Sequence, residues 1–228
     1  MILYYTCNTH PLDIELACRN RLRKASDEPI MSVSLNEEIE FGDIRFVLEG
    51  KKGNTMLHNQ ILFGLQRIAN DETVFLCESD VLYHSSHFDH VLDQNNVFYY
   101  NTNVWKVRYD DGLSVWTDDM IQVSGLCASQ SVLLEYYTQK VLQMEQQGFN
   151  RHYEPGIKQS VGSSLVQTRK SLYPNLCIRH DKTMTKSKWS PEDFRNPQYA
   201  RGWRTSDNVE GWGDTKAVMN EVKLWKFL

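Results

Sequence analysis

The sequence has no long apolar run and no paired cysteine motif, and each absence excludes a class of protein. No stretch of its 228 residues is apolar enough to span a bilayer. Residues 1–5 lack the basic start of a signal peptide, so we expect a cytoplasmic protein with no membrane partner. The five cysteines are an odd number without C-x-x-C spacing, which excludes a disulfide framework and a cysteine zinc site. We expect most of them to be small buried hydrophobes.

The sequence also lacks the glycine-rich fingerprints of common nucleotide-binding proteins. Residues 2–35 predict a strand, a helix that begins near Pro11 and a second strand, which is the β-α-β unit of a parallel sheet. The dinucleotide fingerprint is absent, which argues against a Rossmann dehydrogenase. The P-loop spacing is absent from residues 49–55, although Lys52, just ahead of a helix, could meet a phosphate or lie in a solvated turn.

Charge is distributed unevenly along the chain. A net charge of −4 argues against a surface that coats nucleic acid, and 24% charged with 41% hydrophobic residues is typical of a globular protein. Residues 158–204 nevertheless carry ten Lys or Arg against three acids, with Trp189, Tyr199 and Trp203 among them. This segment suits a flat acceptor that carries phosphate, such as nucleic acid. A solvated loop with anchoring aromatics fits the composition equally well.

An acidic triplet follows the clearest buried strand of the sequence. Residues 74–77 are wholly apolar, and Glu78, Ser79 and Asp80 come directly after them. Ligands bind at the carboxyl ends of strands in open α/β sheets, so two carboxylates at this point predict a cation site. A solvated Asx turn is the alternative.

The remaining segments predict an alternating α/β chain. Residues 122–129 include Gly125, where a backbone could approach a substrate closely. His84, His87 and His90 recur in a predicted turn and helix at 81–89, and we favour hydrogen-bonded caps over a zinc site there. The other predicted elements are strands at 44–48, 97–100, 104–107 and 113–116, a hairpin turn at 110–112, and helices at 57–69, 130–147 and 214–228.

Four features in order resemble the GT-A family of glycosyltransferases. These are Glu78-Ser79-Asp80, Ser124-Gly125, Glu154 and His180, in the places of the family's metal motif, glycine loop, general base and C-terminal histidine. The strings at 77–89, 99–105 and 154–156 are similar to phage transferases, in particular the TET-associated glycosyltransferases. The resemblance implies a Rossmann-like mixed central sheet flanked by helices, with an irregular C-terminal segment. It also implies a single domain over 1–228, with a nucleotide-sugar half at 1–80 and an acceptor half at 81–228.

The resemblance implies roles for individual residues. Asp80, Glu78 and His180 would bind Mn²⁺ or Mg²⁺, and Glu154 would be the general base, with Asp119 in reserve beside Asp118. Contacts to the nucleotide-sugar would come from Thr6, Asn8, His10, Ser34, Lys52, Glu78, Ser79, Lys182 and Lys186. The chain departs from the family pattern at Glu78, where aspartate is usual, and in the Asp-Lys-Thr that follows His180.

The implied reaction moves a sugar from a UDP-sugar to an acceptor hydroxyl with inversion. The acceptor would be a 5-hydroxymethylated pyrimidine, such as 5-hydroxymethylcytosine in bacteriophage DNA in the host cytoplasm, and a glycan or other small acceptor is the alternative. Two other classes remain. A metal-dependent nucleotidyltransferase would need a further acid and a glycine-serine loop, which we do not find. A non-catalytic nucleic-acid-binding module would leave Glu78, Asp80 and His180 without a role.

Overall fold

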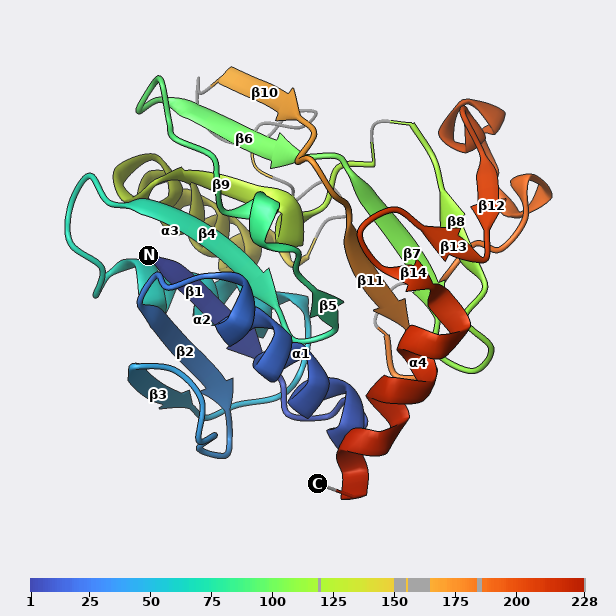
Figure 1. Ribbon diagram of the computed structural model, residues 1–228. Helices are drawn as coiled ribbons and strands as arrows, with labels where there is room; N and C mark the ends of the chain where they lie inside the picture. The colour runs from blue at the N-terminus through green and yellow to red at the C-terminus, as the bar shows by residue number, and fades with distance from the viewer. Residues whose placement is uncertain (119, 150–154, 156–164, 184–185, 228) are drawn as a thin grey trace.

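The structure is a computed structural model that describes residues 1–118, 120–149, 155, 165–183 and 186–227, and two sheets organise it (Figure 1). The first has seven strands in the order β10-β6-β9-β4-β1-β2-β3, and β9 alone runs antiparallel to its neighbours. Its strands are β1 (Ile2–Thr6), β2 (Ile30–Leu35), β3 (Ile44–Leu48), β4 (Thr73–Glu78), β6 (Val97–Asn101), β9 (Leu126–Ser129) and β10 (Leu165–Arg169).

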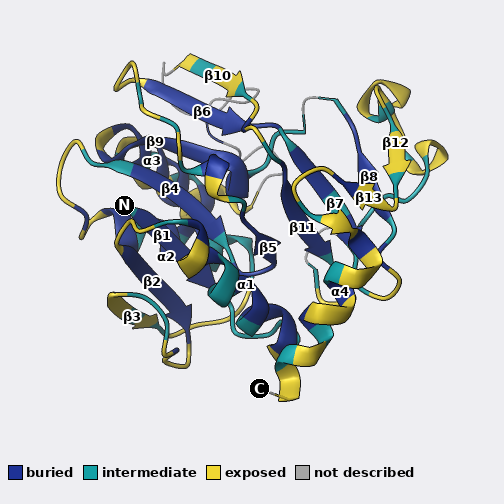
Figure 2. Ribbon diagram, in the orientation of Figure 1, coloured by how far each residue is buried: buried dark blue, intermediate teal, exposed yellow. Residues whose placement is uncertain are grey.

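Helices cover both faces of the first sheet because its central strands are apolar on both sides. In β1, Leu3 and Tyr5 face α2 (Asn54–Leu65) and α3 (Gln130–Gln147), whereas Ile2 and Tyr4 face α1 (Leu12–Ala25). The central strands are buried along their length, and the edge strands β3 and β10 are largely exposed (Figure 2). The core therefore lies in two layers, one on each side of the sheet.

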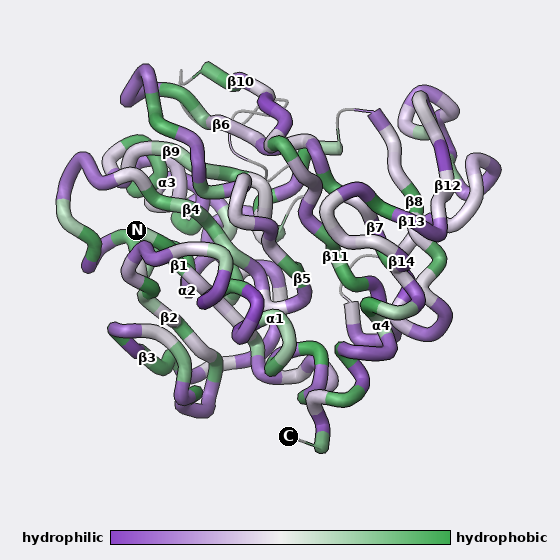
Figure 3. The backbone as a smooth tube through the Cα atoms, in the orientation of Figure 1, coloured by the Kyte–Doolittle hydropathy of each residue, from purple (hydrophilic) through white to green (hydrophobic). Residues whose placement is uncertain are grey.

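The second sheet has five strands in the order β12-β8-β7-β11-β5. One of its faces packs on α1 and on α4 (Thr215–Leu224), where Trp105, Ile178 and Met219 meet Ile14. The loops around β12 are largely hydrophilic (Figure 3). The strands are β5 (Val81–Leu82), β7 (Val104–Arg108), β8 (Ser114–Trp116), β11 (Asn175–Arg179) and β12 (Arg204–Ser206), and β13 (Asn208–Val209) and β14 (Gly213–Asp214) form a separate pair.

The expected α/β fold, with a mixed central sheet, flanking helices and an irregular C-terminal part, is confirmed. After β11 the chain forms only short elements, η3 (Pro191–Asp193), η4 (Pro197–Ala200) and β12 to β14, before α4 begins. The turn at 110–112 joins β7 to β8 as expected. Within the described residues, no helix is long and apolar enough to cross a membrane.

Several sequence-based predictions were wrong in detail. Residues 81–89 do not form a turn and helix throughout, because Val81 and Leu82 pair with β11 as a strand and only Ser85–His87 is helical, as the 3₁₀ turn η1. β9, β10 and β11 were not predicted. Gly125 does permit a close approach, but the partner is the chain itself, since a Cβ there would lie 2.6 Å from the Asn101 carbonyl oxygen.

Candidate functional site

The candidate site lies where three segments of the chain meet at the carboxyl edge of the first sheet. The loop after β1 carries His10, the turn after β4 carries Asp80, and His180 follows β11. β5 leaves Asp80 and pairs antiparallel with β11, so the end of β11 returns to the same place. The Ile178 backbone N–H donates to the Asp80 carbonyl oxygen at 2.8 Å and holds the two segments together.

A pocket opens at this edge between β1, β4 and the start of α2. It brings together six of the predicted site residues: Thr6, His10, Lys52, Glu78, Ser79 and Asp80. The rest of its lining is Tyr5, Cys7, Leu35, Gly53, Asn54, Met56, Leu57, Gln60, Val123, Arg179 and Thr183.

Two imidazoles and one carboxylate converge at the rim of this pocket. One ligand atom from each of His10, Asp80 and His180 lies within 4.8 Å of the others, and this is the one such group in the part of the chain that the structure describes. His10 Nδ1 and His180 Nε2 are 3.0 Å apart. Two neighbouring ligands of one transition-metal ion, each about 2.1 Å from it, are about 3.0 Å from each other. The donor set therefore fits a divalent ion.

The donor types favour one class of ion. Magnesium prefers an all-oxygen shell, whereas imidazole suits the divalent transition metals. Manganese accepts carboxylate and imidazole together, so Mn²⁺ fits His10, Asp80 and His180 better than Mg²⁺ does.

The ring nitrogens of the two histidines form a chain of contacts. The Lys182 backbone N–H donates to His180 Nδ1 at 3.3 Å, which leaves the Nε2 proton of His180 to point at His10. On its other side, His10 Nε2 lies 3.8 Å from the Cys7 thiol. The Asp181 carboxylate lies 3.8 Å from His180 Nδ1, where it can accept a proton from that nitrogen when Nε2 binds a metal.

The two imidazoles are shifted in opposite directions. Burial lowers the pKa of His10, but the Cys7 contact and the Asp80 charge outweigh it, so the pKa is raised. Burial and the neighbouring His10 lower the pKa of His180 despite the Asp80 charge. Burial raises the pKa of the Cys7 thiol, but the contacts to His10 and Thr9 outweigh it and leave the pKa at about 7.

Glu78 lies in the pocket but outside the group of three. The Tyr5 hydroxyl donates to its carboxylate at 3.3 Å. Burial and the Asp80 charge raise the pKa of Glu78 to about 7, against the opposing effect of Arg179. A role for Glu78 in contacting the sugar or ribose remains a prediction, as does its role as a metal ligand.

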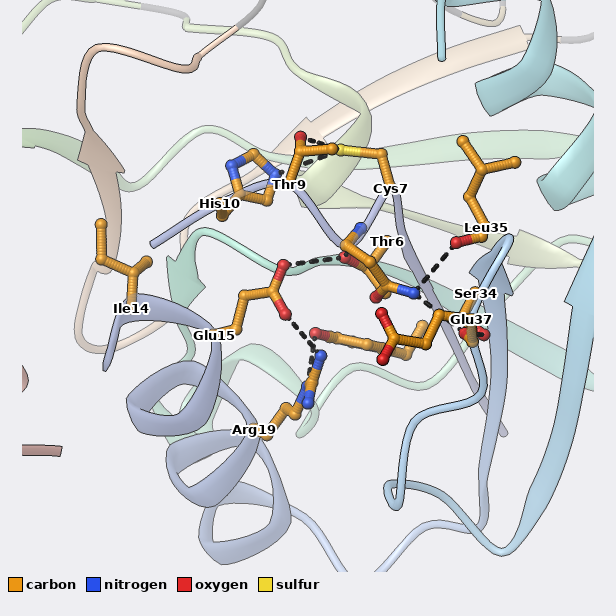
Figure 4. Close-up of polar contacts among 12 residues, drawn as sticks. Thr6, Cys7, Thr9, His10, Ile14, Glu15, Arg19, Ser34, Leu35 and Glu37 are labelled. Atoms are coloured by element: carbon orange, nitrogen blue, oxygen red, sulfur yellow. Dashed lines mark hydrogen bonds and ion pairs between the residues drawn. The ribbon is translucent and has the colours of Figure 1, made fainter. Parts of the chain in front are cut away.

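Two of the residues predicted to contact the nucleoside are used by the backbone instead. The Asn8 amide donates to the carbonyl oxygens of Leu35 and Glu37 at 3.1 and 2.9 Å, with Asn8 itself at a positive φ of 54°. The Ser34 hydroxyl donates to the Glu37 carbonyl oxygen at 2.6 Å. Neither side chain lines the pocket, and both tie the loop after β1 to the loop after β2 (Figure 4).

Thr6 and Gln60 fix the pocket wall. Thr6 Oγ1 accepts from the Asn8 N–H at 3.1 Å and donates to Glu15 at 3.4 Å (Figure 4). The buried Gln60 amide donates to the carbonyl oxygens of Thr6 and Val33 at 2.8 and 2.9 Å. Gln60 was missed from the sequence, where a polar residue between Leu57 and Ile61 on an apolar helix face was the available signal.

The predicted lysines differ in position. Lys52 lines the pocket, and its ammonium group donates to Thr9 Oγ1 at 2.6 Å. Lys182 and Lys186 are exposed and do not line it. Thr183, which was not predicted, does line it, and its hydroxyl donates to the His180 carbonyl oxygen at 2.7 Å.

Several predicted residues lie elsewhere or were missed. The two predicted catalytic acids, Asp119 and Glu154, lie outside the described residues. Arg179, which lines the pocket directly before His180, was missed because no motif marks it.

The three histidines considered for zinc do not converge on a metal site. His87 is fully buried, and its Nδ1 accepts from the amides of Asn101 and Asn175 at 3.0 and 3.1 Å. His84 Nδ1 accepts from the Ser86 N–H at 3.2 Å as the cap of η1. These contacts are structural.

No family model matches the sequence, and no curated protein matches it. The structure is similar to a glycosyltransferase involved in glycosylation of the major capsid of PBCV-1, at 12% identity and a TM-score of 0.42 over 73% of this chain and 80% of that one. A nucleoside-diphosphate-sugar pyrophosphorylase from Vibrio cholerae shares 12% identity at 0.43 over 79% and 93%. The inositol-1-phosphate CTP transferase from T. maritima shares 11% identity at 0.45 over 97% and 95%. At these values the chain is assigned to no family.

Proposed function

We propose that the protein is a metal-dependent glycosyltransferase that moves a sugar from a UDP-sugar to an acceptor hydroxyl. The observation that carries the proposal is the convergence of His10, Asp80 and His180 on one rim of a pocket at the carboxyl edge of the first sheet. The resemblance of the sequence to the GT-A family supports the choice of donor. Residues 1–80 would form the nucleotide-sugar half, and residues 81–228 the acceptor half.

The side chains of the pocket suit a donor that carries a diphosphate. A divalent cation, when bound, stabilises the negative charge that develops on the oxygens of the leaving diphosphate. His10, Asp80 and His180 would hold that cation. Lys52 and Arg179 supply further positive charge to the same pocket, which favours an anionic ligand.

The proposed inversion requires a carboxylate that removes the proton of the acceptor hydroxyl. We assign this role to Glu154, with Asp119 as the second candidate, on the order of the sequence motifs. As the general base, Glu154 would accept the proton while the hydroxyl oxygen attacks the anomeric carbon and the diphosphate leaves.

The proposed acceptor is a 5-hydroxymethylated pyrimidine in phage DNA. The excess of seven positive charges in residues 158–204 supports an acceptor that carries phosphate. A base in duplex DNA must leave the stack for its hydroxymethyl group to reach the anomeric carbon.

Mass spectrometry of nucleosides tests the proposal. DNA that contains 5-hydroxymethylcytosine, and unmodified DNA, are incubated with the protein, Mn²⁺ and a panel of UDP-sugars. We expect a hexose-sized mass gain on the hydroxymethylated DNA alone, lost in Asp80→Ala and retained in Asp27→Ala, which removes an exposed acid between α1 and β2.

The same assay separates the alternatives. Metal-dependent release of UDP without a gain on DNA would move the acceptor to a glycan or small molecule. Release of pyrophosphate from a nucleoside triphosphate would indicate a nucleotidyltransferase. DNA binding that is unchanged in Asp80→Ala, with no release of UDP, would indicate a binding module and refute the proposal.

A further inference from the structure

The second sheet has a basic face beside the pocket. Trp105, Val107 and Ile178 point into the core against α1 and α4. Side chains alternate along a strand, so Lys106 and Arg179 lie on the opposite face. The parallel register of β7 and β11 places Cys177 beside Lys106 and Arg179 beside Arg108.

The loop after His180 crosses this basic face. The Arg179 Nε–H donates to Ser187 Oγ at 2.9 Å. Two residues further on, the Trp189 ring lies 5.2 Å from the guanidinium of Arg108. Lys188 lies between these two anchored positions and is carried toward Lys106.

Lys106 faces cations rather than acids. Burial lowers the pKa of Lys106, and Arg179 and Lys188 lower it further, against a smaller opposing effect of the Cys177 thiol. In the part of the chain that the structure describes, neither Lys106 nor Lys188 forms a salt bridge. Arg108, by contrast, is paired with Asp111. Partly buried like charges repel one another, and an anion between them relieves that repulsion.

This cluster is distinct from the nucleotide pocket. Arg179 lines the pocket, but Lys106 and Lys188 do not. Arg179 therefore joins two adjacent anion-binding regions, with Glu78 and Asp80 acting on its charge from the pocket side. An anion between Lys106 and Lys188 would lie next to the donor without being part of it.

We propose that Lys106, Arg179 and Lys188 bind a backbone phosphate of a nucleic-acid acceptor strand. The inference rests on the proposed function, because it assigns the phosphate to the acceptor of that reaction. Lys106 and Arg179 project from paired strands, so two of the three cations are fixed in place before the strand binds. A phosphate group has enough oxygens to contact all three.

Fluorescence anisotropy with a labelled single-stranded oligonucleotide of about 12 residues tests this site over a range of salt concentrations. We expect Lys106→Met to weaken binding about tenfold and to reduce the salt dependence by about one phosphate contact. Lys216→Met removes an exposed lysine from α4, on the other side of the second sheet, and should leave both quantities unchanged. Lys188→Met is the second test variant, because its side chain comes from a loop and its loss does not threaten the core.

Calorimetric titration with UDP and Mn²⁺ separates this inference from the proposed function. We expect Lys106→Met and Lys188→Met to bind UDP as the unsubstituted protein does. If all of these proteins bind UDP, but oligonucleotide affinity is absent or unchanged by both substitutions, the phosphate site is refuted and the transferase proposal stands. If the unsubstituted protein fails to bind UDP with Mn²⁺, the proposed function fails, whatever the oligonucleotide does.

Discussion

Replacing Glu78 with glutamine should stabilise the metal-free protein, and the gain should depend on pH. The Glu78 carboxyl lies mostly buried beneath the Tyr5 hydroxyl and near Asp80, and burial followed by the Asp80 charge raises its pKa from 4.5 to about 7. Glutamine keeps the shape of the side chain and an oxygen that accepts from Tyr5. It cannot ionise.

The sign follows from the protons bound by each state. Between pH 4.5 and about 7 the folded protein keeps the Glu78 proton, whereas the unfolded chain has released it. The folded state then binds more protons, so the free energy of unfolding falls as the pH rises through this window. Below pH 4.5 both states are protonated, and the group has no effect on stability.

The magnitude follows from the same two values. A tenfold change in an equilibrium is about 1.4 kcal/mol, so the shift from 4.5 to about 7 sets an upper limit of about 3 kcal/mol. The carboxyl is partly solvated and shares its charge effects with Asp80, so we expect about 1–2 kcal/mol at pH 8.

Urea unfolding at a series of pH values measures this effect, with a chelator present. The difference between Glu78→Gln and the unsubstituted protein should be near zero at pH 4.5, grow to about pH 7 and then stay constant. Glu49→Gln, at an exposed position, should show no such difference. Parallel stability curves for the protein with and without Glu78 would refute the reasoning. Mn²⁺ should shrink the difference, because a nearby cation favours the ionised carboxylate.

Three further predictions concern the metal site and the sheet. Asp80→Asn should reduce Mn²⁺ affinity by about 100-fold in calorimetric titration while the melting temperature of the metal-free protein changes little, and His84→Gln should leave that affinity unchanged. Asp181→Asn should weaken Mn²⁺ binding about tenfold, because the amide accepts the His180 Nδ1 proton less well than the carboxylate; equal affinities would remove Asp181 from the site. Gly125→Ala should lower the free energy of unfolding by about 2 kcal/mol or more, because its Cβ would lie 2.6 Å from the Asn101 carbonyl oxygen, and an unchanged urea midpoint would contradict this.

The elements that could be predicted from the sequence are those with strong local patterns. The apolar run at 74–77 and the stripe Leu133, Tyr137, Val141 and Met144 on α3 are buried as expected. β11 was missed because its five residues lie in a basic segment and become a strand only by pairing with β7, about seventy residues earlier. β9 was missed because its four apolar residues directly precede a helix, and its pairing with β4 and β6 is long-range.

The candidate site divides in the same way. Asp80 could be found because it ends an apolar strand, and His180 through the order of motifs. His10 was expected to contact the nucleoside, and its approach to His180 depends on the pairing of β5 with β11, which no local pattern encodes. Asn8 and Ser34 had the right residue types in the right loops, but the backbone around Leu35 and Glu37 uses their hydrogen bonds.

The three converging side chains also have a mechanical consequence. His10 and Asp80 follow strands of the first sheet, and His180 follows a strand of the second, so one ion would fasten the two sheets together. Binding to the folded state alone raises stability by mass action. Chelation should therefore loosen the ends of β1 and β11 together, and amide hydrogens on both sides of the junction should exchange faster, far from any change in the cores on either side.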